Sequence, residues 1–201
     1  MLRDINWAED RDYRTGSDDE PLQFYIDALC NSNTFDLLLG YFSSSAINVL
    51  SLGFANFIHS GGKMRAVIND VLSQEDRDAI KRGQDKDSFM TIYDFEDIKE
   101  LKSSLDEYGK HFFECFAWLI ANDRIDIKIV KPKHRKGIAH YKSGVFSDGK
   151  DFVSFKSSCN FTYYGFLENL EELDVRVSWE TQDLKKINKQ STNFERLFSE
   201  K

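Results

Sequence analysis

The stretch AHYKSGVFSDGKDFVSFKSSCNFTYYGFLENLEELDV, residues 139–175, contains the pattern that decides the fold. Two runs of strand-forming residues flank the turn signal SDGK (147–150), which predicts two strands joined as a β-hairpin. A third run, LDVRVSW (173–179), alternates apolar and polar residues and predicts another strand. Side chains alternate between the two faces of a strand, so His140 and Lys142 are predicted to point the same way.

Two apolar runs outside this stretch predict strands that are covered on both faces. They are FDLLLGYF (35–42) and KMRAVIND (63–70). IDIKIV (125–130) alternates and predicts a strand with one polar face. Helices are predicted over 17–31, 43–62, 73–83, 109–123 and from Glu180 onward. This order predicts an α/β fold with a mixed, mostly parallel β-sheet sandwiched between helices.

The length predicts a single folding unit. The chain has 201 residues, which is enough for one domain with a substantial core. Residues 1–17 are expected to form a polar N-terminal segment. Residues 18–201 are expected to form one domain, which could itself be one domain of a longer protein.

Composition and charge exclude several classes of protein. Apolar residues make up 41% of the chain and there are two prolines, which is typical of a globular rather than a disordered protein. No window approaches 18 consecutive apolar residues, and the charged start lacks a signal-peptide core, so we expect a cytoplasmic protein without a membrane span. Three cysteines without a C-x-x-C pair argue against a disulfide framework or a zinc site. The net charge of −7 argues against nucleic-acid binding by the overall field, but not by a local groove.

Polar side chains are predicted to meet at the open end of the hairpin. A His and a Lys on one sheet face are expected where the space above them holds an anion, because an unpaired ammonium is costly to bury. Ser158 and Asn160 follow the return strand and add hydroxyl and amide donors. A carboxylate at Glu171 could hold one imidazole nitrogen of His140 and leave the other free to attack.

The residues HYK…SSCN…NLE resemble the H-x-K…G-S-x-N…E signature of the phospholipase D superfamily. The segments LLLGYFSSSAINVL and MRAVIND are similar to the front half of its nuclease-type members, which are often attached to bacterial helicases or restriction-type enzymes. The resemblance extends from residue 34 to residue 179. It implies a phospholipase D-like fold and phosphodiester hydrolysis that needs no metal and no cofactor.

The resemblance also implies a role for each residue of the signature. His140 would be the nucleophile that forms a phosphohistidine. Lys142, Ser158 and Asn160 would bind the non-bridging phosphate oxygens and stabilise charge in the transition state. Glu171 would orient and polarise His140. In this family a second His, from a second copy of the motif, protonates the leaving group.

The sequence departs from the family pattern in three ways. The Asp expected five residues after the Lys, which is mainly structural in the family, is replaced by Ser147, with Asp148 next to it. The Gly before the motif Ser is replaced by Ser157, which could crowd the phosphate. Only one copy of the motif is present, so a complete site requires a homodimer; otherwise the chain is half of an enzyme.

Each candidate also has a simpler interpretation. His140 could be a structural histidine, and Lys142 an ordinary strand lysine. Asn160 could cap a following helix, and Ser158 could merely end a strand. Glu171 has acidic neighbours that a surface helix would also carry.

A basic cluster and one aromatic residue are weaker candidates for contacts with nucleic acid. The cluster KPKHRK (131–136) could touch phosphates or be a solvated loop. Aromatic side chains near the site could stack on a base or pack against the protein. The residues in question are Lys133, His134, Arg135, Lys136 and Tyr163.

The sequence thus predicts a metal-independent phosphodiesterase, an endonuclease-type hydrolase of DNA, that works through a phosphohistidine and is completed by homodimerisation. The alternative is a non-catalytic nucleic-acid-binding or dimerisation module of a helicase or restriction system, as a partner or a fused domain. Hydrolysis of lipid headgroups is less favoured because no amphipathic membrane-binding helix stands out.

Overall fold

The computed structural model describes residues 1–85, 97–107, 109–131 and 140–200. Its strands form one seven-stranded sheet in the order β1-β7-β6-β5-β2-β3-β4. They are β1 (Asp12–Arg14), β2 (Thr34–Leu39), β3 (Lys63–Asn69), β4 (Ile125–Val130), β5 (Lys142–Ser147), β6 (Phe152–Ser157) and β7 (Glu172–Val177). The helical segments are η1 (Leu2–Asp4), α1 (Pro21–Cys30), α2 (Ser45–Val49), α3 (Ser51–His59), α4 (Gln74–Gln84), α5 (Ile98–Asp106), α6 (Lys110–Ala121), α7 (Tyr163–Leu167) and α8 (Thr181–Ser199).

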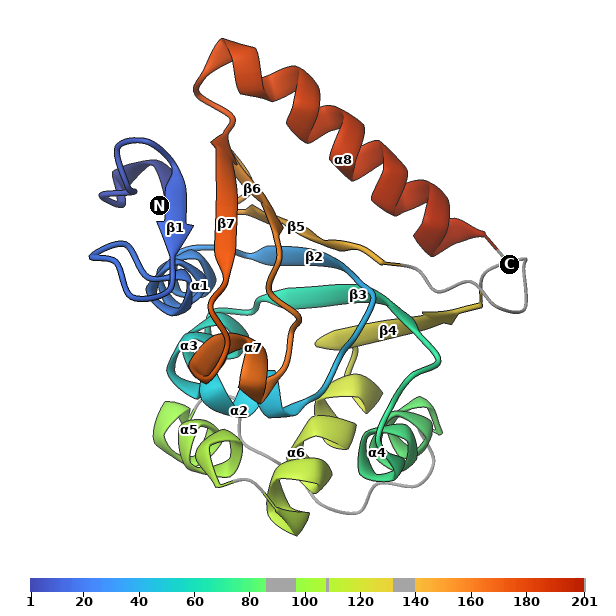
Figure 1. The fold of residues 1–201 in the computed structure, drawn as a ribbon. Helices are drawn as coiled ribbons and strands as arrows, with labels where there is room; N and C mark the ends of the chain where they lie inside the picture. Colours follow the sequence, from blue (N-terminus) through green and yellow to red (C-terminus); the bar gives the residue numbers. More distant parts are fainter. Residues whose placement is uncertain (86–96, 108, 132–139, 201) are drawn as a thin grey trace.

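The sheet lies between helices, as predicted, but it is not mostly parallel. In Figure 1 α8 covers one side of the sheet and the other helices lie on the opposite side. β2, β3 and β4 pair in parallel, whereas the pairs β2–β5, β5–β6, β6–β7 and β1–β7 are antiparallel. The hairpin turn forces β5 and β6 to run in opposite directions, because a tight turn cannot join parallel strands. The mixed α/β architecture is therefore confirmed, and the expected excess of parallel pairs is wrong.

Stacked aromatic rings fix the position of the hairpin against β2. Phe35 of β2 lies directly opposite Phe146 of β5, and their rings stack with centroids 4.0 Å apart. Phe155 of β6 is paired with Gly144 of β5, and its ring occupies the space beside the glycine. A Cβ at Gly144 would lie 2.7 Å from that ring. These side chains belong to the main core between the sheet and the helices on that side. Burial of such large rings is the main stabilising term for this layer.

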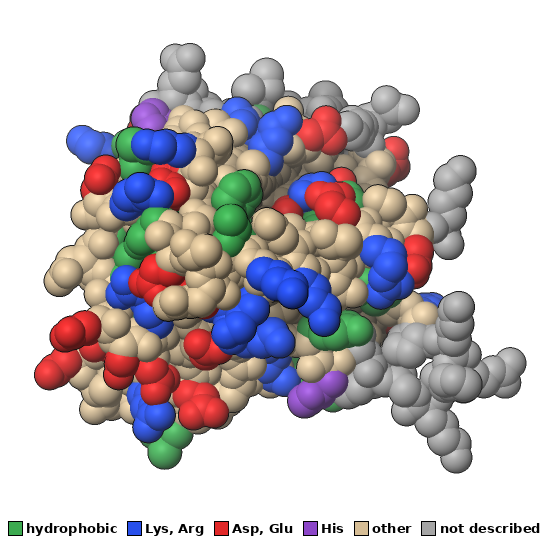
Figure 2. Space-filling model, turned by 90° about the horizontal axis from the view of Figure 1, so that it is seen from above, with side chains coloured by type: hydrophobic (Ala, Val, Ile, Leu, Met, Phe, Trp, Pro, Cys, Tyr) green, Lys and Arg blue, Asp and Glu red, His purple; other side chains and the backbone are tan. Residues whose placement is uncertain are grey.

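Helix α8 is attached to the opposite face by a smaller apolar cluster and one arginine. Arg65 of β3 donates to both carboxylate oxygens of Asp36, at 2.8 and 2.7 Å, and to Glu195 of α8 at 2.6 Å. Its guanidinium also lies 5.1 Å from the ring centroid of Phe194 and 5.2 Å from that of Phe198. Figure 2 looks onto this face and shows Lys and Arg side chains gathered near its middle.

The helix predicted over 43–62 is divided in two. Leu50 has φ −93° and ψ 20° and separates α2 from α3. The other predicted helices and strands that fall on described residues are present. Of the helices that the structure describes, none is long and apolar enough to cross a membrane.

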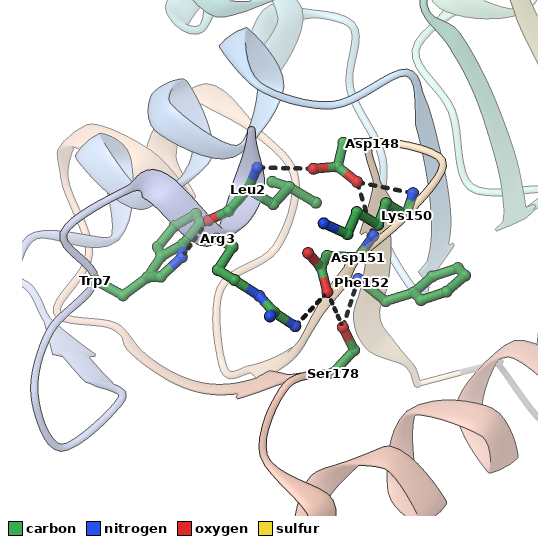
Figure 3. A network of polar contacts seen from close by, with 8 residues as sticks. All are labelled: Leu2, Arg3, Trp7, Asp148, Lys150, Asp151, Phe152 and Ser178. Atoms are coloured by element: carbon green, nitrogen blue, oxygen red, sulfur yellow. Dashed lines mark hydrogen bonds and ion pairs between the residues drawn. The ribbon is translucent and has the colours of Figure 1, made fainter.

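The N-terminal segment is part of the core rather than a loose extension. β1 pairs with β7, and Leu2, Trp7 and Tyr13 are buried in the main core. Asp148, in the β5–β6 turn, accepts hydrogen bonds from the backbone N–H groups of Leu2 at 2.9 Å, Lys150 at 2.9 Å and Asp151 at 2.7 Å (Figure 3). Asp148 therefore ties the start of the chain to the turn at the end of the hairpin remote from His140.

The side chain of Asp151 completes this junction. It accepts a hydrogen bond from Arg3 at 2.9 Å and one from the hydroxyl of Ser178 at 3.2 Å (Figure 3). Burial raises the pKa of Asp148, but its three backbone donors outweigh that effect and hold the pKa below its usual value. Asp148 thus has a structural role at a position one residue beyond the Asp of the family pattern.

We predict that Asp148→Ala lowers the free energy of unfolding at pH 7 by about 1–3 kcal/mol, because it leaves backbone donors without their acceptor. The pKa of Asp148 is lowered in the folded state, so the stabilisation is present above the unfolded pKa of about 4 and is lost as the pH falls through the folded pKa. Urea unfolding of wild type and variant at neutral and acidic pH measures both effects. Asp4→Ala, at an exposed position in the same segment, is the control, and an equal loss in both variants would contradict the prediction.

Candidate active site

The predicted site residues lie at one end of the sheet, where β2 and β6 end and β5 and β7 begin. The register pairs Leu39 at the end of β2 with Lys142 at the start of β5. It also pairs Ser157 at the end of β6 with Leu173 near the start of β7. The parallel strands β2, β3 and β4 point their carboxyl ends toward this edge, which is where open α/β sheets bind ligands.

His140 and Lys142 are in contact at this edge. The Nζ of Lys142 lies 3.3 Å from the Nε2 of His140. His140 is exposed and precedes the strand, which begins at Lys142, so the prediction that both lie within the strand is wrong. An ammonium is a donor only, so the contact requires Nε2 to present its lone pair, and the proton of a neutral ring is then on Nδ1. Nε2 is therefore the nitrogen with nucleophilic character.

Ser158 and Glu171 are joined to each other. The hydroxyl of Ser158 donates to Oε2 of Glu171 and accepts from the backbone N–H of Glu172 at 3.0 Å. The other oxygen of Glu171 accepts from the side chain of Asn169 at 3.1 Å. Among the residues that the structure describes, no hydrogen bond connects Glu171 with His140. Glu171 thus holds the end of β6 to the start of β7, and its predicted contact with His140 stays a prediction.

Cys159, between Ser158 and Asn160 in the motif turn, has a buried thiol. Cys159 is 2% exposed, and burial raises the pKa of its thiol to about 12. The Glu171 carboxylate contributes to this increase in pKa, whereas the Lys142 ammonium opposes it. Burial is the largest of these causes, so the thiol stays protonated at neutral pH.

Asn160 is held by a compact turn that leads into α7. Its carbonyl oxygen accepts from the N–H of Thr162 at 2.9 Å, and the thiol of Cys159 donates to it at 3.3 Å. Thr162 is the residue that caps α7, because its hydroxyl accepts from the N–H of Gly165 at 3.1 Å. The Oδ1 atom of Asn160 is buried and has no partner among the described residues. Asn160 therefore does not cap the helix, and its amide is available for another role.

Two residues of this turn were not identified from the sequence. Thr162 caps the helix and Gly165 allows it to pack, because a Cβ at Gly165 would lie 2.1 Å from the carbonyl oxygen of Asn160. The signal was present in the order T-x-x-G directly after the motif. Its importance depends on the close approach of α7, which the sequence does not reveal.

Ser157 uses its hydroxyl within the backbone. The hydroxyl donates to the carbonyl oxygen of Glu172 at 3.0 Å and accepts from the N–H of Cys159 at 2.8 Å. Ser157 and Ser158 also line a surface hollow of about 620 Å³, one wall of which is formed by Asp12 and Arg14 of β1. The side chain that replaces the expected Gly is therefore engaged with the chain itself.

The weaker candidates divide into two groups. Lys133, His134, Arg135 and Lys136 lie outside the described residues. Tyr163 begins α7 and is 41% exposed beside the Asn160 turn.

Comparison with solved structures identifies the architecture. NucT from Helicobacter pylori matches with a TM-score of 0.53 and 13% sequence identity, over 88% of this chain and 86% of NucT. Nuc from Salmonella typhimurium, a phospholipase D family member, matches with a TM-score of 0.54 and 12% identity, over 93% of this chain and 91% of Nuc. The chain has a phospholipase D-like fold.

A third match covers a part of a larger protein. The polyphosphate kinase from Porphyromonas gingivalis has a TM-score of 0.50 and 10% identity over 94% of this chain, but over 26% of the kinase. No protein-family model matches the sequence, and no curated protein matches it either. The phospholipase D-like fold confirms the fold that the resemblance implied.

We predict that Gly165→Ala destabilises the protein by about 1–3 kcal/mol, because the added methyl group must displace the Asn160 turn or α7. Urea unfolding measures this loss. Gly109→Ala is the matched control, since a Cβ at Gly109 has no heavy atom within 4 Å. Equal stability of the two variants would show that α7 does not hold the turn.

Proposed function

We propose that the chain is a metal-independent phosphodiesterase of nuclease type that cleaves DNA through a phosphohistidine intermediate. The observation that carries the proposal is the contact of 3.3 Å between Lys142 and His140, because it joins a nucleophile and a cation at an exposed sheet edge. Ser158 and Asn160 lie at the end of the strand that pairs with the strand of Lys142. The phospholipase D-like fold supports the same chemistry.

The proposed first step uses the lone pair on Nε2 of His140. A bond forms between Nε2 and phosphorus while the bond from phosphorus to the leaving oxygen breaks. Lys142, Ser158 and Asn160 donate hydrogen bonds to the non-bridging oxygens, where negative charge increases. The leaving oxygen takes a proton from His140 of the partner subunit, and water then hydrolyses the phosphohistidine. The site is thus proposed to be complete in a homodimer.

Glu171 is proposed to accept the Nδ1–H of His140 when substrate is bound. Its two oxygens face Ser158 and Asn169 in the structure, so this role requires the carboxylate or the imidazole to rotate. The same observation favours a second candidate function, in which the pocket holds a nucleic-acid backbone without cleaving it. In that case the chain serves a helicase or restriction system as a binding or dimerisation module. Association with such a system, and a cytoplasmic location, remain predictions from the sequence.

We predict that the wild-type chain cleaves plasmid or single-stranded DNA in excess EDTA, and that His140→Ala lowers the rate by about 1,000-fold or more, because the attacking atom is removed. Gel analysis of the products measures the rate. His59→Ala is the matched control, since His59 is an exposed histidine at the end of α3, outside the site.

Three results would separate the candidate functions. EDTA-resistant cleavage that is lost in His140→Ala and kept in His59→Ala supports the phosphohistidine mechanism. Cleavage that survives in His140→Ala would contradict it. An inert wild type that still binds DNA in a salt-dependent manner would contradict catalysis and assign the chain to the binding module.

We also predict that the activity per chain falls when the protein is diluted below the dissociation constant of its dimer, because each site then lacks its second histidine. Initial rates over a range of concentrations, together with the mass from analytical ultracentrifugation, measure this dependence. A monomer with a constant rate per chain would rule out completion of the site by dimerisation.

A further inference from the structure

The exposed tyrosines of the described chain all lie on segments that flank the candidate site. Tyr13 and Tyr25 are buried in the main core, with 5% and 2% of their surfaces exposed. The other four described tyrosines are exposed, by 37% at Tyr41, 43% at Tyr141, 41% at Tyr163 and 68% at Tyr164.

Hydrogen bonds join the segments that carry these tyrosines. The N–H of Gly40 donates to the carbonyl oxygen of Tyr141 at 2.7 Å, which places Tyr41 next to the segment of His140. The N–H of Tyr163 donates to the hydroxyl of Ser45 at 3.1 Å, and residue 43 bonds to residue 161. Three segments, 40–45, 140–142 and 160–164, thus form one continuous border around the motif residues.

Helix α7 carries two of the exposed tyrosines, Tyr163 and Tyr164, and is bonded to both sides of the site. The segment 160–171 leaves the sheet at Asn160 and returns at Glu171. The N–H of Asn169 donates to the carbonyl oxygen of Tyr164 at 2.9 Å, and its side chain donates to Glu171. The rings of Tyr163 and Tyr164 lie 5.6 Å apart and at 83° to each other. The backbone that carries the two rings is therefore held to Asn160 through Thr162 and to Glu171 through Asn169.

We propose that Tyr163 and Tyr164 stack the unpaired bases of single-stranded DNA beside the phosphate site, with Tyr141 at the border. Every base has a flat apolar face, and exposed aromatic rings beside a backbone-binding site favour strands whose bases are free to leave the stack. In a duplex those faces are covered by neighbouring base pairs. The pair of tyrosines therefore selects single strands over duplex DNA. The position of the phosphate in this arrangement rests on the proposed function.

A protein partner is the competing occupant, because Leu167 and Leu170 extend the apolar surface and are 45% and 88% exposed. The tyrosines, rather than these leucines, adjoin the motif turn: Tyr163 follows Thr162 directly, and Thr162 bonds to Asn160. We therefore assign the tyrosine border to DNA and leave the protein partner as an outcome of the test.

The test measures the affinity of the 201-residue chain for three labelled probes by fluorescence anisotropy. The probes are an oligothymidylate, a strand of abasic sites with the same number of phosphates, and a blunt duplex. Every protein carries His140→Ala, so that the strands stay intact. Three forms are compared: His140→Ala alone, His140→Ala with Tyr163→Ala and Tyr164→Ala, and His140→Ala with Tyr163→Phe and Tyr164→Phe. Leu184→Ala, which removes an exposed apolar side chain on α8, is the matched control.

The double Ala variant is expected to bind oligothymidylate about 10- to 100-fold more weakly, with less than a twofold change for the abasic strand and the duplex. The double Phe variant keeps the rings and is expected to retain the affinity, as is Leu184→Ala. Oligothymidylate binding that is unchanged in the double Ala variant would overturn the proposal. An equal loss for all three probes would also overturn it, and so would a change in oligomeric state at unchanged affinity.

Failure of the proposed function is read from a separate experiment. Wild type that cuts neither the abasic strand nor the oligothymidylate lacks the phosphodiesterase activity. The binding comparison still decides whether the tyrosines stack bases, because it uses proteins that do not cleave. Circular dichroism confirms that each variant is folded before its affinity is compared.

Discussion

The antiparallel pairing of β2 with β5 is the constraint on which the rest of the structure depends. It joins a parallel three-stranded unit, β2-β3-β4, to an antiparallel unit, β5-β6-β7-β1. The stacked rings of Phe35 and Phe146 fix its register, since a shift of one strand by one residue would place the two rings on opposite faces of the sheet. The same register places Lys142 opposite Leu39 at the carboxyl end of the parallel strands. The apolar core thus determines where the cation of the site lies.

The site then follows from what the strand ends leave exposed. Backbone N–H and C=O groups at the strand ends need hydrogen-bond partners from outside the sheet. The hydroxyls of Ser157, Ser158 and Thr162 are the partners of several such groups here. The charged groups Lys142 and Glu171 remain at this end of the sheet, and they shift the pKa of the buried Cys159 thiol in opposite directions. His140 contacts the cation rather than the acid. This arrangement sets the lone pair of Nε2 against the Lys142 ammonium and leaves Oδ1 of Asn160 without a partner among the described residues.

The sequence predicts most of this fold because each element carries its own local signal. The hairpin follows from SDGK between two strand-forming runs, and the buried strands follow from their apolar composition. The strand directions could not be predicted in the same way, because direction depends on which strands become neighbours. The burial of Leu2 and Trp7 in the core was not predicted, because it depends on contacts between distant parts of the chain. Leu2 is bonded to Asp148, more than 140 residues away. The motif residues were found from their spacing, whereas Gly165 and the division at Leu50 depend on tertiary packing.

The replacement of the expected Gly by Ser157 shows how a departure from a motif can be accommodated. A serine at this position adds a hydroxyl where a glycine leaves space for phosphate. Here the hydroxyl has both a donor and an acceptor in the backbone, at Cys159 and Glu172, so it is turned toward the junction of β6 and β7. The hydrogen bonds that it makes stabilise the turn that carries Ser158 and Asn160. Ser157 therefore stabilises the turn that carries the proposed phosphate-binding residues and that leads into α7 with its two tyrosines.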